Sequence, residues 1–273
     1  MSRLATTVDD TLSFSNAARR NGAGVSLKMR RTNIPFARMG TAVAEPRLCF
    51  ALDVPTAGDA IAWVDLLADD VGVFKIGLEL FVAEGPSIVR RIRARGVDVF
   101  LDLKLHDIPN TVASAVRRAV DLDVRYLTLH ASGGPAMMRQ AAQAAQSTST
   151  VLLAVTILTS LGDDELLRAG HVGGAVTLVP MLATLAAESR IGGVVCSPLE
   201  IAAVKRVAPD LVIVTPGVRG VNDASDDQTR TRSAAEAIQA GAHVVVVGRP
   251  IKNARDPIRA ARQLAKEIAS TST

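Results

Sequence analysis

The sequence predicts a single α/β domain folded as a closed (β/α)₈ TIM barrel. Short apolar segments with strand character alternate with segments of helical periodicity, and this strand–helix unit occurs eight times within residues 45–273. Strands that are apolar throughout are typical of parallel sheets covered by helices. Eight units in a chain of this length also match the size of a closed barrel, typically about 250 residues.

An open, doubly wound sheet is the alternative architecture. Dinucleotide-binding folds of that class carry a G-x-G-x-x-G turn after the first strand. The corresponding turn here is Asp53-Val54-Pro55-Thr56, which lacks those glycines. The sequence therefore favours the closed barrel, with neither an internal repeat nor a second domain.

Each predicted strand is an apolar segment bounded by polar or turn-forming residues. The strands are 48–53, 72–77, one that begins at 99 and ends before 107, 125–130, 150–156, 193–196, 211–215 and 244–247. Each predicted helix has helical spacing of apolar residues, and several begin at a Thr, Asp or Pro suited to a first turn. The helices are 56–67, 86–95, 109–120, 135–146, 163–168, 175–188, one from 198, 234–240 and one from 256.

Residues 1–44 differ in composition from the remainder. They contain seven Lys and Arg residues against two Asp, whereas residues 45–273 contain 24 basic and 25 acidic residues. The net charge of +4 therefore belongs to this extension, and the barrel shows no basic footprint for nucleic acid. We expect the extension to be flexible and disordered. A transit peptide, a flexible leader and a start at Met39 all stay open.

The sequence gives little support for a membrane-spanning helix or for a metal site. No apolar segment reaches the roughly 18 residues that a membrane-spanning helix needs. Cys49 and Cys196 both lie in predicted strands and are expected to be buried thiols, which favours a reducing cytoplasm. His106 and His130 have no partner at a metal-ligand spacing, so we predict structural, hydrogen-bonded histidines and no metal site.

Charged residues stand at the end of the third predicted strand. Asp102 and Lys104 are two residues apart and should point to the same side of that strand, with Leu103 opposite. Asp107 follows the strand, and Pro109 suits the first turn of the next helix. The carboxyl ends of barrel strands are where catalytic groups gather. An unpaired charge in such an apolar segment would be costly, which indicates a partnered cluster.

Polar residues recur at the ends of other predicted strands. The residues expected at one mouth of the barrel are Asp53, Lys75, Asp102, Lys104, Asp107, Thr159 and Arg249. Each opposite pair at about 4 Å contributes about 4 kcal/mol before desolvation, at an effective dielectric constant of about 20. Such a network would keep the lysines protonated, as a proton donor requires. A plug of salt bridges that only closes the barrel is the alternative interpretation.

Glycine and arginine follow the last two predicted strands, where barrels often bind phosphate. Residues 217–220 (Gly-Val-Arg-Gly) follow the seventh strand, and Gly248, Arg249 and Pro250 follow the eighth. Gln228 lies in the long polar loop between these segments, a candidate lid. Plain glycine turns beside a surface arginine are the alternative.

These motifs together resemble the orotidine 5′-phosphate decarboxylase family. The most specific one is residues 102–111, D-L-K-L-H-D-I-P-N-T. The others occur in the family's order and are residues 51–53 (A-L-D), 74–77 (F-K-I-G), 130–134 (H-A-S-G-G), 158–160 (L-T-S), 215–219 (T-P-G-V-R) and 247–251 (V-G-R-P-I). The chain departs from many members at Gly220, where they have proline, and from some at Leu78, where they have lysine.

The resemblance implies decarboxylation of orotidine 5′-phosphate to uridine 5′-phosphate without a cofactor, in the last step of pyrimidine nucleotide synthesis. It implies a homodimer with shared sites, in which Asp107 and Thr111 reach the ribose of the partner subunit's ligand. Lys104 would deliver a proton to the ring carbon that loses CO₂, and Asp102 would lie beside the substrate carboxylate. Lys75 would belong to the same charged network.

The resemblance also implies the residues that bind the substrate. They are Asp53 and Lys75 at the ribose, Thr159 at the pyrimidine, and Arg219, Gln228, Gly248 and Arg249 at the phosphate. One alternative is a metal-dependent sugar-phosphate decarboxylase or epimerase on a related barrel, which the lysine at the end of the second strand disfavours. Another is a nucleotide-binding barrel that keeps the site without catalysis.

Overall fold

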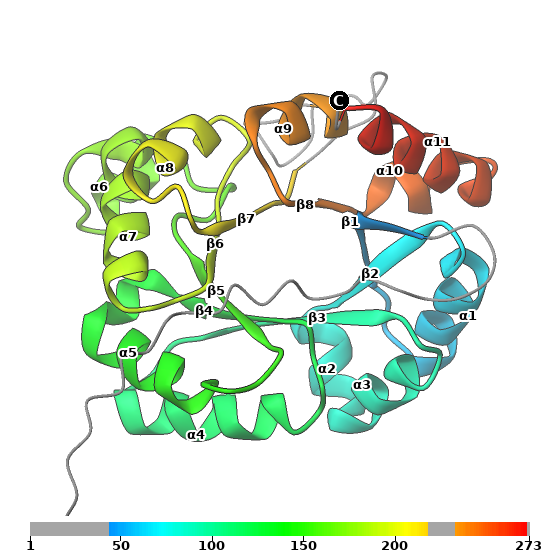
Figure 1. The fold of residues 1–273 in the computed structure, drawn as a ribbon, viewed down its shortest axis with the longest axis horizontal. Helices are drawn as coiled ribbons and strands as arrows, with labels where there is room; N and C mark the ends of the chain where they lie inside the picture. The colour runs from blue at the N-terminus through cyan, green and yellow to red at the C-terminus, as the bar shows by residue number, and fades with distance from the viewer. Residues whose placement is uncertain (1–43, 218–232, 272–273) are drawn as a thin grey trace, which may run out of the picture. The chain divides into compact units, whose positions relative to one another are not determined.

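Eight parallel strands close into a barrel in chain order, and β8 pairs with β1 (Figure 1). The computed structural model describes residues 44–217 and 233–271. The strands are β1 (Glu45–Ala51), β2 (Val71–Ile76), β3 (Asp98–Leu105), β4 (Tyr126–His130), β5 (Val151–Val155), β6 (Gly193–Val195), β7 (Val212–Thr215) and β8 (Val244–Val247). The predicted closed barrel is confirmed, and the alternative prediction of an open, doubly wound sheet is wrong.

The helices surround the barrel, as the view in Figure 1 shows. They are α1 (Ala57–Leu67), α2 (Leu78–Glu84), α3 (Pro86–Arg93), α4 (Pro109–Val120), η1 (Ala131–Gly133), α5 (Gly134–Ala144), α6 (Asp163–Arg168), α7 (Gly174–Glu188), α8 (Ile201–Val207), α9 (Ala234–Ala240), α10 (Arg249–Lys252) and α11 (Pro257–Ser270). Sequence periodicity did not predict α2, η1 or α10, which are short and follow strand ends directly.

Predicted helix boundaries agree closely with the structure except before α8. The sequence suggested a helix from residue 198, but α8 begins at Ile201. Two side-chain bonds hold the preceding residues in a turn instead. The Leu199 N–H donates to Ser197 Oγ at 3.2 Å, and the Ser197 N–H donates to Glu200 Oε2 at 2.9 Å. Side chains that bond nearby backbone compete with helical hydrogen bonds in this way.

The apolar core has two parts. One cluster contains strand residues only, among them Cys49, Ala51, Val73 and Phe100, and it therefore fills the inside of the barrel. The other cluster joins the outward faces of the strands to the helices. Both cysteines are buried free thiols, as expected, although Cys196 lies just after β6 rather than in it. This division fixes which side chains can reach the barrel mouth.

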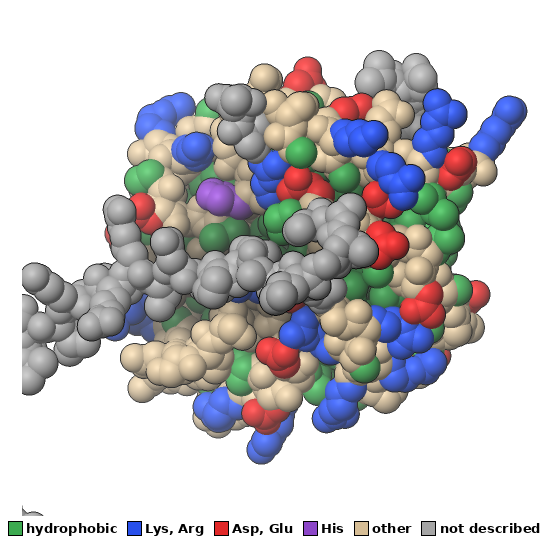
Figure 2. Space-filling model, turned by 45° about the vertical axis from the view of Figure 1, so that its right-hand side comes forward, with side chains coloured by type: hydrophobic (Ala, Val, Ile, Leu, Met, Phe, Trp, Pro, Cys, Tyr) green, Lys and Arg blue, Asp and Glu red, His purple; other side chains and the backbone are tan. Residues whose placement is uncertain are grey.

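The outside of the barrel carries mixed charge. Figure 2 shows lysine and arginine side chains interspersed with aspartate and glutamate side chains over one face. Within residues 44–217 and 233–271, no helix combines the length and apolar character needed to cross a membrane. The expectations for residues 1–44, including Met39, fall almost wholly outside the described residues, as do those for Arg219, Gly220 and Gln228.

A histidine ties β7 to β8 and predicts a pH effect on stability. The Ile213 N–H donates to His243 Nδ1 at 3.0 Å, which requires a neutral ring. Burial, and then the charge of Lys205, lower the pKa of His243 below its usual value. The unfolded chain therefore binds more protons than the folded chain below about pH 6.5, and the free energy of unfolding should fall as pH decreases through that range.

Urea unfolding at about pH 7.5 and 5.5 measures this loss of stability. His243→Asn replaces the ring by an acceptor that does not titrate, so the loss should be smaller in this variant. An equal loss in both proteins would contradict the account.

Candidate active site

Four charged side chains form a continuous chain at the carboxyl ends of β1, β2 and β3. Lys75 Nζ lies 3.1 Å from Asp53 Oδ1 and 3.8 Å from Asp102 Oδ2. Lys104 Nζ lies 2.7 Å from the same Asp102 oxygen. The order is therefore Asp53, Lys75, Asp102, Lys104, with opposite charges adjacent at each step. The structure brings together four of the predicted site residues.

Strand alternation places three members of this charged chain, Asp53, Lys75 and Asp102, on top of the barrel interior. Cys49 and Ala51 face the inside from β1, and Asp53 continues their side of the strand after β1 ends. Phe100 faces the inside from β3, and Asp102 is the next residue on that side. The charges thus rest on an apolar floor. The enclosure of the Lys75 and Asp102 side chains strengthens the attraction between them.

Lys75 and Asp102 are the most enclosed members, with side chains 13% and 12% exposed. Burial alone would favour the neutral amine of Lys75, but the nearby charges of Asp53 and Asp102 outweigh it and raise the pKa of Lys75. Below it, burial raises the pKa of the Cys49 thiol, despite the opposing charge of Lys75. Lys75 is therefore held as a cation above a neutral thiol.

Lys104 occupies an unusual backbone conformation. Its φ is 51°, in the left-handed region that side chains other than glycine rarely adopt. The pairing of β3 with β4 shifts register between Leu101 and Leu105, so Lys104 sits in an irregularity of the strand. The prediction that Asp102 and Lys104 point to the same side is confirmed by their 2.7 Å contact, although the strand is irregular at Lys104. Their side chains meet at this local distortion.

Thr128 is a residue of the site that the sequence did not reveal. It is fully buried in β4, and its hydroxyl donates to Asp102 Oδ1 at 2.9 Å. The Thr128 hydroxyl oxygen in turn accepts the backbone N–H of Lys104 at 2.9 Å. A polar residue two positions from Tyr126, which faces the barrel interior, was the available signal. Thr128 therefore contacts both members of the closest ion pair of the charged chain.

Other predicted residues lie near the mouth but outside the charged chain. Asp107 is exposed between β3 and α4, and its Oδ1 accepts the Ile108 N–H at 2.6 Å. Thr111 is exposed in the first turn of α4. Thr159 is half-buried between β5 and α6. Among the described residues, no hydrogen bond joins any of these three to the charged chain.

The start of α10 lies beside the end of β1. A Cβ on Gly248 would stand 3.6 Å from Ala51 Cβ and 4.0 Å from Asp53 Oδ2, so the Gly248 backbone approaches the charged chain. Arg249 follows as the exposed first residue of α10. Lys252 Nζ donates to the Asp53 carbonyl oxygen at 2.7 Å, a contact that sequence reasoning missed. This edge of the mouth therefore combines backbone, arginine and lysine donors.

His106 and His130 pack against each other, with ring centroids 5.4 Å apart. Burial, followed by the charges of His106 and Lys104, lowers the pKa of His130. Neither ring makes a hydrogen bond to another described residue, and the prediction that both are structural, hydrogen-bonded histidines stays a prediction. Within the same described part of the chain, no three His, Cys, Asp or Glu side chains gather as metal ligands would.

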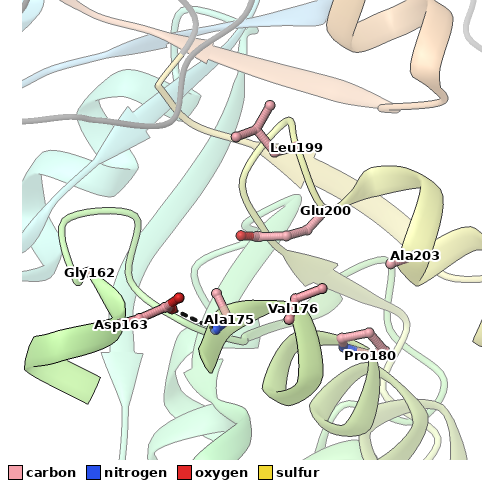
Figure 3. Close-up of a pocket in the computed structure, with 8 residues that line it drawn as sticks. All are labelled: Gly162, Asp163, Ala175, Val176, Pro180, Leu199, Glu200 and Ala203. Atoms are coloured by element: carbon pink, nitrogen blue, oxygen red, sulfur yellow. Dashed lines mark hydrogen bonds between the residues drawn. The ribbon is translucent and has the colours of Figure 1, made fainter. Parts of the chain in front are cut away.

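A separate cavity of about 380 Å³ lies between the segment after β6 and the starts of α6 and α7. Figure 3 shows its lining residues, with the Ala175 N–H donating to Asp163 Oδ1 at 3.1 Å. Its charged lining residues are Asp163 and Glu200, both acidic, and none of its lining residues is a predicted site residue. A phosphate would be repelled there, so the charged chain is the better candidate site.

Comparison with known proteins identifies the family. The model of the orotidine 5′-phosphate decarboxylase / HUMPS family matches residues 46–264. The chain belongs to this family. It is 48% identical over 231 residues to orotidine 5′-phosphate decarboxylase of Trichlorobacter lovleyi, covering 82% of this chain and 96% of that protein. Identity to the enzyme so named from Anaeromyxobacter dehalogenans is 49% over 220 residues, covering 80% and 96%.

The fold comparison agrees with family membership. The crystal structure of orotidine 5′-phosphate decarboxylase from Lactobacillus acidophilus superimposes with a TM-score of 0.71 at 33% identity. The match covers 81% of this chain and 98% of that chain. The resemblance drawn from the motifs is therefore confirmed at the level of the family and of the barrel. The roles of individual residues stay predictions.

Proposed function

We propose that this chain decarboxylates orotidine 5′-phosphate to uridine 5′-phosphate and CO₂, the last step of pyrimidine nucleotide synthesis, without a cofactor. The supporting observation is the Lys104–Asp102 pair, 2.7 Å apart, over the apolar interior of the barrel. Membership of the family and the names of the relatives support the same reaction. A cytoplasmic location stays a prediction.

Lys104 is the proposed proton donor. When the bond between the ring carbon and the carboxylate breaks, CO₂ leaves and the electron pair stays on that carbon. An ammonium fixed beside the carbon stabilises this charge as it develops, then transfers a proton to form the new C–H bond. Asp102 holds the amine in place and would lie beside the departing carboxylate. Asp107 is assigned to the catalytic group by family resemblance.

The remaining predicted residues would bind parts of the substrate that do not react. Asp53 and Lys75 are proposed to contact the ribose, and Thr159 the pyrimidine. Gly248 and Arg249, with Arg219 and Gln228 outside the described residues, are proposed to hold the phosphate. Binding energy from remote groups of this kind can be used to stabilise the transition state.

We propose that the active form is a homodimer with shared sites. Asp107 and Thr111 are exposed at the barrel end that carries the charges, where they can reach a neighbouring subunit. The apolar side chains of Leu78, Val82 and Ile108 follow β2 and β3 at this end and are 52%, 80% and 68% exposed. We propose that the partner subunit covers these side chains. Sedimentation of the purified chain should show a dimer, and a monomer active at assay concentrations would contradict shared sites.

Arg249→Ala should weaken substrate binding more than it slows the chemical step. The arginine would form a charge-assisted, forked contact with phosphate, and each such hydrogen bond contributes about 1.5–3 kcal/mol. We therefore expect kcat/KM to fall by about 10- to 100-fold, mostly through KM. Steady-state kinetics measure this, with exposed Arg206→Ala on α8 as the matched control. Unchanged kcat/KM in Arg249→Ala would argue against a phosphate contact.

A spectrophotometric assay with orotidine 5′-phosphate, run with and without EDTA, tests the proposed function. We expect turnover that EDTA does not reduce. A metal-dependent sugar-phosphate decarboxylase or epimerase on a related barrel is the second candidate, and the EDTA comparison distinguishes it. Metal-dependent turnover of a pentulose phosphate would favour that candidate. Stabilisation by uridine 5′-phosphate without release of CO₂ would instead indicate a barrel that only binds nucleotide.

A further inference from the structure

We propose that Thr128 is a positioning residue for the reaction, because its hydroxyl fixes both the backbone of Lys104 and the carboxylate of Asp102. This inference rests on the proposed function and adds a residue to it. The hydroxyl is fully buried and lies 2.9 Å from the Lys104 nitrogen and 2.9 Å from Asp102 Oδ1. One side chain thus joins the proton donor to the acid that holds it.

The two bonds assign opposite roles to the same oxygen. The backbone N–H of Lys104 can only donate, so the Thr128 oxygen accepts there. A carboxylate can only accept, so the hydroxyl hydrogen must point to Asp102. The direction of both bonds is therefore fixed, and the hydroxyl cannot rotate without losing one of them. Leaving this partly buried N–H unpaired would be costly, so the bond ties the Lys104 backbone to β4.

This tie accounts for the strained conformation of Lys104. At φ 51° the residue has left the regular ladder between β3 and β4, in the register shift between Leu101 and Leu105. Such conformations persist where the surrounding structure holds them. Thr128 supplies the hydrogen-bond partner from the neighbouring strand at this point. The hydroxyl therefore helps to set the position from which the Lys104 side chain leaves the backbone.

The same hydroxyl also sets the rotation of the Asp102 carboxylate. Oδ1 accepts from Thr128, which leaves Oδ2 to face Lys104 at 2.7 Å and Lys75 at 3.8 Å. Without the hydroxyl, the carboxylate could turn and the Lys104 amine could shift, whereas Lys75 keeps its 3.1 Å contact with Asp53. A displacement of about 1 Å in catalytic geometry can cost about 100-fold in rate. The loss should fall on the chemical step, because Thr128 is not among the residues proposed to bind ribose, base or phosphate.

Thr128→Val removes the hydroxyl and keeps the shape of the side chain, and Thr128→Ser keeps the hydroxyl. We expect Thr128→Val to lower kcat by about 10- to 100-fold while KM changes by less than about threefold. Thr128→Ser should keep kcat within about threefold of the wild type. Thr128→Ala also removes the hydroxyl and leaves a smaller side chain. Its kcat should fall as much as that of Thr128→Val, so it provides a second variant if Thr128→Val does not fold.

Thr150→Val is the matched control for a structural effect. Thr150 is also buried, directly before β5, and its hydroxyl donates to the Val124 carbonyl oxygen at 2.7 Å. This variant should lose thermal stability without loss of kcat. Wild-type kcat in the folded hydroxyl-free variants, or an equal kcat loss in Thr150→Val, would overturn the inference. An inactive wild-type protein would instead count against the proposed function itself.

Discussion

Replacing Lys104 by alanine should lower kcat for orotidine 5′-phosphate by about 10⁴-fold or more, while uridine 5′-phosphate still binds. Proton transfer by a positioned side chain contributes about 10²- to 10⁴-fold, and charge stabilisation at the reacting atom adds about 10²- to 10³-fold. Lys104 is proposed to supply both. Lys75 lies 3.8 Å from Asp102 and still balances part of that charge in the variant. Steady-state kinetics measure the loss of kcat, and titration calorimetry with uridine 5′-phosphate measures binding separately.

Lys266→Ala provides the control for this experiment. Lys266 is an exposed lysine on α11 and belongs to none of the proposed contacts. Its removal changes the net charge by the same amount and should leave kcat and KM unchanged. A Lys104→Ala protein with near-normal kcat would refute the proton donor. Loss of uridine 5′-phosphate binding in Lys104→Ala, without unfolding, would show that Lys104 acts in binding instead.

Gly193→Ala should destabilise the barrel by about 3 kcal/mol or more. A Cβ at this position in β6 would clash with the Val212 carbonyl oxygen and would stand 2.7 Å from Leu153 Cδ2. Gly193 pairs with Leu153 of β5 and Val212 of β7, so two neighbouring strands would have to move. Overpacking of a core typically costs about 1–3 kcal/mol, and a backbone atom yields less readily than a side chain. Thermal unfolding should show a decrease in Tm of about 6–12 °C.

Gly58→Ala is the matched control, with the opposite sign expected. Gly58 lies in α1, and the nearest atom to its added Cβ would be Thr56 Oγ1 at 3.7 Å. Alanine in a helix is favoured over glycine by about 1 kcal/mol, so Tm should rise slightly. An unchanged Tm for Gly193→Ala would contradict the crowding between β5, β6 and β7. A decrease for Gly58→Ala would show that glycine itself, rather than space, matters at both positions.

Much of the site could be predicted because strand ends meet at one mouth of a parallel barrel. Asp53, Lys75 and Asp102 each stand at the end of a regular apolar strand, where side-chain direction follows from alternation. The order of charges also favoured pairing, since an apolar strand does not tolerate an isolated charge. Thr56 was likewise predictable as the cap of α1, and its Oγ1 accepts the Asp59 N–H at 3.2 Å.

The remainder depends on contacts between strands that a single sequence does not display. The left-handed backbone at Lys104 arises where β3 leaves register with β4, and a local pattern gives no sign of it. Thr128 reads as an ordinary strand residue until β4 is placed beside β3. The restriction at Gly193 likewise appears only when Val212 lies beside it. Lys252 reaches the Asp53 carbonyl oxygen from α10, which was too short to predict.

A crystal structure with uridine 5′-phosphate bound would test the central proposal most directly. The distance to measure runs from Lys104 Nζ to the ring carbon from which CO₂ would have departed. We expect about 3–3.5 Å, the separation at which reacting atoms stand before transfer, with Asp102 still bonded to the amine. A Lys104 amine that points away from the base, with another cation or no cation at that carbon, would contradict the proposed mechanism.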